Sequence, residues 1–114
     1  MGIMENAKKH FGDQEVKKID VPEWSNGKGE PLTIYAKPTT VLDRDWAIKR
    51  AGGGIGLKFM AYLLIRMATD ADGNKLFTLE DKRDLIQNVD GGVVTRIGNK
   101  ILNAQSVADM EKNS

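Results

Sequence analysis

Residues 57–68 read LKFMAYLLIRMA, and only Lys58 and Arg66 in this stretch are charged. In a helix with about 100° per residue these two side chains lie about 80° apart, which leaves roughly three quarters of the surface apolar. As a helix the stretch spans about 18 Å, too short for the roughly 30 Å apolar slab of a membrane. Two interpretations stay open: a central core helix, or a helix that another subunit or a partner protein partly covers.

A partner that covers this helix would touch its large apolar side chains and the tryptophan upstream. The predicted partner-binding set comprises Trp46, Leu57, Phe59, Met60, Leu63, Leu64 and Met67. Methionine suits either interpretation, because its thioether packs adaptably against partners and also fills gaps in a core. Substitution of Phe59 or Leu64 by aspartate distinguishes the two interpretations. If the residue lies in an interface, the variant loses its oligomers but stays folded; if it lies in the core, the variant unfolds.

Upstream of this stretch, the pattern predicts an antiparallel β-hairpin with a mobile tip. Residues 15–24 carry a weak period-two pattern, and Pro22 confines them to an edge strand. Residues 32–37 alternate more cleanly, with one face formed by Leu32, Ile34 and Ala36. Asn26-Gly27 in the connection is a strong turn signal.

After Lys37-Pro38 the hydrophobic period changes from two to about 3.6, which indicates helices. Thr39 or Thr40 is expected to cap a first helix that runs to about Arg50, and the apolar stretch forms the second. The predicted fold class is therefore α+β: an N-terminal antiparallel β-hairpin followed by about four short α-helices.

The last two predicted helices follow a polar turn. Thr78 begins the third, because its hydroxyl can accept a hydrogen bond from the backbone N–H of Asp81, and Gly91-Gly92 ends it. The buried stripe expected on this helix is Leu85, Ile86 and Val89. The stripe of the fourth is Val93, Val94, Ile97, Ile101 and Leu102.

The first and second predicted helices are joined by a glycine-rich run that comprises Gly52, Gly53, Gly54 and Gly56. Glycine removes both the Cβ constraint and side-chain packing, so this run is interpreted as a hinge or a tight connection. A hinge here would permit domain swapping. Light-scattering mass before and after shortening the run tests this.

The chain has 114 residues, enough for one modest core. We expect a flexible N-terminal arm at 1–14, a single α+β domain at 15–105 and a polar C-terminal tail at 106–114. With a formal charge of +1, we expect no large electrostatic field that would attract the protein to nucleic acid or to an anionic membrane. The N-terminal residues lack the pattern of a secretory signal, so no export is expected. The absence of cysteine suits a reducing compartment.

The inventory of reactive side chains predicts no enzyme and no cofactor. His10 is the single histidine and there is no cysteine, so one chain cannot build a zinc site or a Cys/His pair. The carboxylates of the helical half are interleaved with lysine and arginine, which favours solvated faces. Trp24, Trp46 and the sparse Arg96-Lys100 pair fall short of a nucleic-acid surface.

Residues 70–74, DADGN, invite comparison with a calcium loop. Positions 1, 3 and 5 fit, but position 6 is Lys75 instead of glycine, and position 12 is the short Asp81. An Asx-rich turn between helices is therefore favoured over a calcium site. The glycine run lacks the Lys-Ser/Thr ending of a phosphate-binding loop.

The order of several segments resembles the tail assembly chaperones of long-tailed bacteriophages. These segments are Val21-Pro22-Glu23-Trp24, a glycine-bearing turn, a second strand that leads into a threonine-started helix, residues 70–81 (DADGNKLFTLED) and Glu111-Lys112-Asn113. The resemblance covers about residues 15–113. The glycine run at 52–56 departs from the family pattern and leaves the geometry of the middle helices open.

The resemblance implies a non-virion protein of the host cytoplasm. Such a protein coats the long, aggregation-prone tape measure protein, helps recruit tail tube subunits around it, and self-associates. A longer form made by ribosomal frameshifting is also implied. Glu111-Lys112-Asn113 permits the codons GAA-AAA-AAC, which contain a slippery A-AAA-AAC heptamer; the gene sequence tests this hypothesis.

Two other functions remain open at this point. A structural head-tail connector or tail completion protein would also be small, free of cysteine and oligomeric, and mass spectrometry of purified particles separates it from a chaperone. A calcium-binding helix-loop-helix module is the other, and a calcium titration of the melting temperature tests it.

Overall fold

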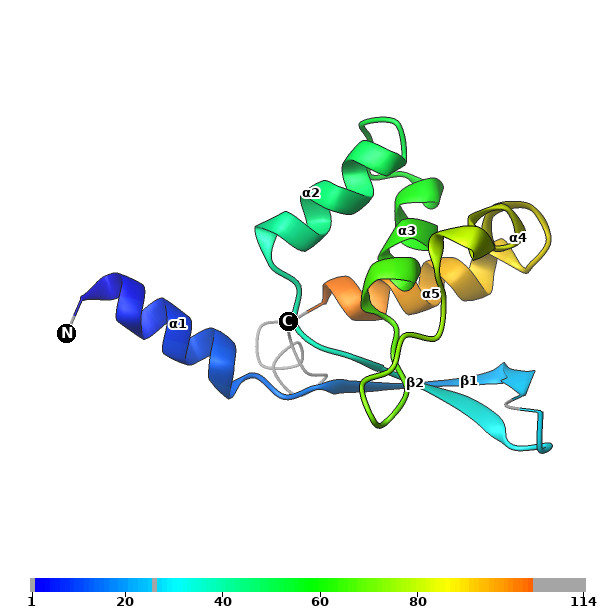
Figure 1. The fold of residues 1–114 in the computed structure, drawn as a ribbon, viewed down its shortest axis with the longest axis horizontal. Coiled ribbons are helices and arrows are strands. Elements are labelled where there is room, and N and C mark those ends of the chain that lie inside the picture. Colours follow the sequence, from blue (N-terminus) through cyan, green and yellow to red (C-terminus); the bar gives the residue numbers. More distant parts are fainter. Residues whose placement is uncertain (1, 26, 104–114) are drawn as a thin grey trace, which may run out of the picture.

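The computed structural model describes residues 2–25 and 27–103. Its elements, in chain order, are α1 (Ile3–Asp13), β1 (Lys17–Ser25), β2 (Pro31–Ala36), α2 (Val41–Arg50), α3 (Leu57–Met67), the short 3-10 helix η1 (Leu79–Asp81), α4 (Lys82–Gln87) and α5 (Gly91–Leu102) (Figure 1). The fold is α+β, as predicted. The hairpin is not N-terminal, however, because α1 precedes it.

Helix α1 occupies most of the segment at residues 1–14 that was expected to be a flexible arm. It has 11 residues, and none of its side chains is buried. The ribbon extends away from the body of the molecule and meets it only near its C-terminal end (Figure 1). Residues 3–13 of the expected arm therefore form a helix with no buried side chain.

The hairpin has the predicted faces. Ile19 pairs with Ile34, and Val21 pairs with Leu32, in an antiparallel register that becomes irregular between Val21 and Ser25. Pro22 lies in that irregular part, as expected for a residue that cannot donate a ladder hydrogen bond. Ile19, Val21 and Ile34 are buried and face the helices.

The segment after α3 extends this small sheet by one bridge. Tyr35 and Thr69 exchange two backbone hydrogen bonds, both 2.9 Å long. Thr69 in turn bridges to Lys75 across the polar turn. The end of the apolar helix is thereby tied to the outer edge of β2.

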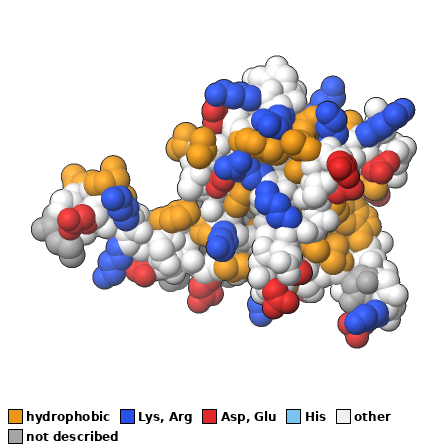
Figure 2. Space-filling model, viewed as in Figure 1, with side chains coloured by type: hydrophobic (Ala, Val, Ile, Leu, Met, Phe, Trp, Pro, Cys, Tyr) orange, Lys and Arg blue, Asp and Glu red, His pale blue; other side chains and the backbone are white. Residues whose placement is uncertain are grey.

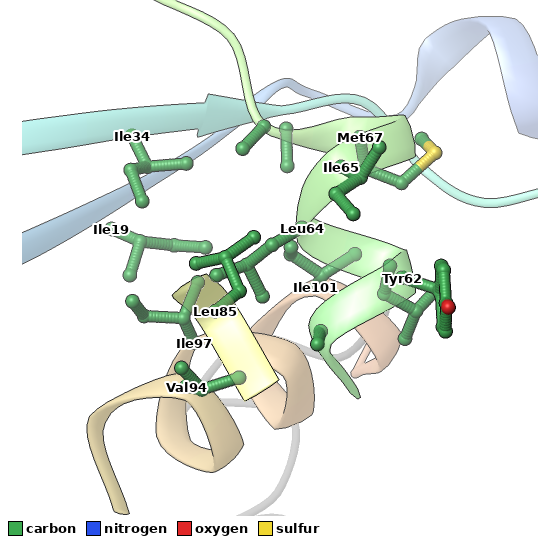
Figure 3. Packing of buried hydrophobic residues seen from close by; sticks show 14 of the residues in the cluster. Ile19, Ile34, Tyr62, Leu64, Ile65, Met67, Leu85, Val94, Ile97 and Ile101 are labelled. Carbon is green, nitrogen blue, oxygen red and sulfur yellow. The ribbon is translucent and has the colours of Figure 1, made fainter. Parts of the chain in front are cut away.

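Helix α3 lies at the centre of the core. It packs against α2, α4 and α5, and its buried side chains meet those of the hairpin (Figure 3). The fully buried side chains with the largest volumes are Ile19, Ile34, Leu63, Leu64, Ile97, Ile101 and Val21. Of the two interpretations left open for residues 57–68, this conformation shows the core helix.

The C-terminal helices differ from the prediction at their junction. Thr78 caps η1 and not a continuous long helix: its hydroxyl accepts from the backbone N–H of Glu80, while the carboxylate of Asp81 accepts from the backbone N–H of Thr78 at 2.8 Å. Gly91 and Gly92 do not end a helix; they begin α5. The reason is Asp90, whose carboxylate accepts from the backbone N–H of Gly92 at 2.7 Å and caps the new helix.

At this junction the observed burial of Val89 also differs from the prediction. Val89 was expected in the buried stripe of the third helix, but α4 ends at Gln87 and Val89 is 37% exposed. The stripe predicted for α5 is confirmed, with Val93, Val94, Ile97 and Ile101 buried and Leu102 partly buried.

Polar contacts fasten α5 to the hairpin. Arg96 donates two hydrogen bonds to the carboxylate of Glu23, at 2.5 and 2.8 Å. At the other end, the ammonium of Lys17 donates to the backbone carbonyl of Lys100 at 2.7 Å.

Within the described residues, no helix is long and apolar enough to cross a membrane. The predicted tail at 106–114 lies outside the described residues.

Candidate functional site

The predicted partner-binding residues separate into two environments. Phe59, Leu63, Leu64 and Met67 are buried in the core, with exposed fractions of 2%, 0%, 0% and 9%. Met60 and Trp46 are partly buried. Leu57 is 72% exposed and is the member that faces solvent. In this conformation, most of the set holds the chain together and is not accessible to a partner.

Trp46 is enclosed by side chains of α2 and α3. The guanidinium of Arg50 lies 4.2 Å from its ring centroid and that of Arg66 lies 5.3 Å away. Tyr62 meets the indole edge to face, with ring centroids 6.4 Å apart. The contacts with Tyr62 and Arg66 join α2 to α3, the contact with Arg50 lies within α2, and Trp46 is partly buried among them.

Asp43 connects this aromatic cluster to the start of α2. It forms a capping box with Thr40, accepting from the Thr40 backbone N–H at 2.9 Å. Its other oxygen accepts from Nε of Arg66 at 2.7 Å. Partial burial raises the pKa of Asp43, but hydrogen bonds from Thr40 and Arg66 outweigh burial and hold the pKa below its ordinary value. The carboxylate therefore stays ionised and keeps Arg66 in place.

The glycine run, which was interpreted as a hinge or a tight connection, forms a defined helix end. Gly52 donates its N–H to the carbonyl of Lys49, and Gly53 donates to the carbonyl of Ile48 at 2.8 Å. Both glycines have positive φ, 93° and 98°. This is the hydrogen-bond pattern of a Schellman motif, in which glycine ends a helix. Gly54 and Gly56 complete the connection to α3, with open space around each.

An apolar surface on α1 was not predicted from the sequence. Ile3, Met4 and Phe11 are 87%, 67% and 42% exposed. The signal was present, because Ile3, Ala7 and Phe11 are spaced by four residues, which places them on one side of a helix. Exposed apolar side chains on α1 gather away from the body of the molecule (Figure 2).

A second pair of exposed apolar side chains, Val41 and Leu42, lies at the start of α2, where they are 87% and 68% exposed. Ile55, which is 71% exposed, lies apart from them on the connection that follows the other end of α2. Large apolar side chains this exposed are unremarkable singly, but groups of them mark surfaces that bind other proteins.

A cleft lies between the C-terminal end of α1 and the body of the molecule. It encloses about 400 Å³ and is lined by Phe11, Lys37, Pro38, Asp43, Arg66, Met67 and Lys75. Its charged lining is mainly basic, since Asp43 is the single acid among the described residues that line it and is bonded to Arg66. The chemistry of this lining suits a carboxylate-bearing segment.

The polar turn at residues 70–74 adopts the Asx-type arrangement that the sequence favours. Oδ1 of Asp70 accepts from the backbone N–H groups of Asp72 and Asn74, both at 2.9 Å. Gly73 has a φ of +87°. The backbone hydrogen bond from Asn74 is the largest cause that lowers the pKa of Asp70. Within the described residues, no group of three or more His, Cys, Asp or Glu side chains is placed to hold a metal ion.

Comparison with known proteins gives no relative. No protein-family model, no curated protein and no solved structure matches the chain. The features of the chain that bear most directly on its function are the exposed apolar face of α1 and the basic cleft beside it.

Proposed function

We propose that this chain is a tail assembly chaperone of a long-tailed bacteriophage, which binds the tape measure protein and helps recruit tail tube subunits in the host cytoplasm. The observation that carries the proposal is α1, an amphipathic helix with no buried side chain, on which Ile3 and Met4 are 87% and 67% exposed. A chaperone of a long helical client needs such a face, because apolar helix contacts give affinity without catalysis.

The exposed side chains of α2 support the same function. Val41 and Leu42 offer further apolar surface, distinct from the core around α3. A protein that coats a long client needs more than one contact surface, because it must hold the client and its neighbouring subunits together. Self-association and a longer frameshifted form that contacts the tail tube protein belong to this proposal.

Coexpression with the tape measure protein tests the function. The wild-type chain should keep a tagged tape measure protein soluble and be retained with it on an affinity column. Met4→Asp should reduce retention, because it places a charge on the apolar face of α1. Ile55→Asp is the matched control: Ile55 is similarly exposed but lies on the connection between α2 and α3. The proposal would be contradicted if the wild-type chain did not retain the tape measure protein, or if wild type and Met4→Asp retained it equally.

Mass spectrometry of purified particles tests the competing structural role. A chaperone is expected to be absent from mature particles, whereas a head-tail connector or tail completion protein would be present in stoichiometric amounts. Sequencing of the gene region adds a second check, since a tape measure gene directly downstream is expected.

A further inference from the structure

The apolar face of α1 has an ordered arrangement of charges beside it. At about 100° per residue, Ile3, Ala7, Phe11 and Met4 fall within an arc of about 100°. This apolar face is called the α1 stripe below. Lys8 lies about 40° beyond one edge of the stripe and His10 about 20° beyond the other. Glu5 and Asp13 lie on the opposite side of the helix. The stripe is therefore bordered by basic side chains and not by acidic ones.

The α1 stripe continues into the basic cleft. Phe11 is the last residue of the stripe and also lines the cleft, together with the cations Lys37, Arg66 and Lys75. Lys37 and Lys75 are exposed, and Arg66 is held by Asp43 at 2.7 Å. The surface that begins as an apolar helix face thus ends in a pocket with an excess of positive charge.

We propose that the α1 stripe and the cleft together bind an amphipathic helix whose apolar face is flanked by acidic side chains. The apolar face of the bound helix covers Ile3, Met4 and Phe11, and a carboxylate at its end meets Lys37 and Lys75 in the cleft. The inference deepens the proposed function and rests on it, because it assigns this chemistry to the client segment that the chaperone holds.

The charges favour such a partner over a second copy of α1. Two copies packed stripe to stripe would bring no acidic side chain to the basic border or to the cleft, because Glu5 and Asp13 lie on the opposite side of α1. They also favour a protein over a lipid surface. In α1 the two acids Glu5 and Asp13 balance Lys8 and Lys9, so the helix gains little from anionic headgroups.

Two synthetic peptides provide the probe. Both are helical, of roughly 18 residues, with the same leucine stripe. Glutamates flank the stripe in one peptide, and lysines flank it in the other. With fluorescein-labelled peptides and the full chain, the glutamate peptide should bind about tenfold more tightly or better, and its affinity should fall as salt rises. Equal affinity for the two peptides would overturn the proposal.

Three variants locate the binding surface. Phe11→Asp should abolish binding of the glutamate peptide, because it places a carboxylate where stripe and cleft meet. The double reversal Lys37→Glu/Lys75→Glu should weaken binding about tenfold or more. Lys82→Glu/Arg83→Glu changes the net charge equally but lies on α4, outside the cleft lining, and should leave affinity unchanged. Thermal melts confirm that each variant is folded.

Equal weakening by the two double reversals would overturn the proposal, because only net charge would then matter. A dimer in light scattering that Ile3→Asp dissociates would assign the stripe to a second copy and overturn it as well. Phe11-dependent sedimentation with phosphatidylserine vesicles would overturn it in favour of a lipid surface.

The same variants separate this inference from the proposed function. If Phe11→Asp and Lys37→Glu/Lys75→Glu retain the tape measure protein as well as wild type does, the inference fails and the chaperone function stands. If the wild-type chain binds the glutamate peptide through these residues but never retains the tape measure protein, the binding surface stands and the client assignment fails.

Discussion

Met60 of α3 lies directly against Gly98 of α5. A Cβ atom at Gly98 would be 2.5 Å from Sδ of Met60 and 2.9 Å from its Cβ, closer than real side chains approach. Gly98 is buried, and its lack of a side chain lets α5 come close to the central helix. The position of α5 against α3 therefore depends on a glycine inside a helix, where alanine would otherwise be preferred.

Gly98→Ala should destabilise the protein. Overpacking of this kind costs about 1–3 kcal/mol, and the gain of about 1 kcal/mol in helix propensity offsets only part of it. Chemical denaturation measures the difference in unfolding free energy. Gly98→Ala in a Met60→Ala background is the control, because alanine lacks the Sδ and Cγ atoms of Met60 and keeps only its Cβ, so the loss of stability should be smaller there. An equal effect in both backgrounds would show that the contact is unimportant.

Leu64→Asp should unfold the protein, because Leu64 has no exposed surface and a buried unpaired carboxylate costs several kcal/mol, comparable to the stability of a small protein. Leu57→Asp in the same helix should leave the fold intact, since Leu57 is 72% exposed. Circular dichroism and thermal melts distinguish the two. A folded Leu64→Asp variant that has lost only its oligomers would return residues 57–68 to the interface interpretation.

The glycines of the Schellman motif should respond differently from their neighbours. Gly52→Ala and Gly53→Ala should each cost about 1–2 kcal/mol, because both positions have positive φ. Gly54→Ala should be neutral or stabilising by about 0.4–1 kcal/mol, because Gly54 has ordinary φ and open space around it. Melting temperatures of the three variants check this. Equal tolerance of all three would indicate a flexible hinge and not a defined helix end.

The Glu23–Arg96 pair should make stability depend on acid. The hydrogen bond from Arg96 lowers the pKa of Glu23 from 4.5 to about 2. Because the folded-state pKa is depressed, the contribution is complete above about pH 4.5 and is lost as the pH falls towards 2. Glu23→Gln should therefore lower the melting temperature at about pH 6 and have progressively less effect as the pH falls from about 4.5 towards 2.

The size of this effect is modest, since both side chains are partly exposed, at 37% for Arg96 and 41% for Glu23. High salt should reduce the difference between wild type and Glu23→Gln at neutral pH. A difference that persists unchanged at low pH would assign the effect to packing instead of to charge.

Local features of the sequence were enough to predict much of the fold. The alternation of Leu32, Ile34 and Ala36 gave the inward face of β2, and Thr40 and Thr78 marked where helical structure begins. These signals are readable because strand alternation, helix period and capping involve residues only a few positions apart. The same reasoning went wrong at Gly91-Gly92, where the nearby cap Asp90 turns an expected stop into a start.

The candidate site was harder to predict, because it joins segments that are distant in sequence. The charge count of residues 57–68 by itself determined that a helix there needs cover on most sides. Only the tertiary structure decided that the hairpin, α2, α4 and α5 supply that cover, which removes Phe59, Leu63, Leu64 and Met67 from the surface. It also brought Phe11 beside Lys37 and Lys75. Periodicity identifies an apolar face but not what packs on it, because that depends on long-range packing.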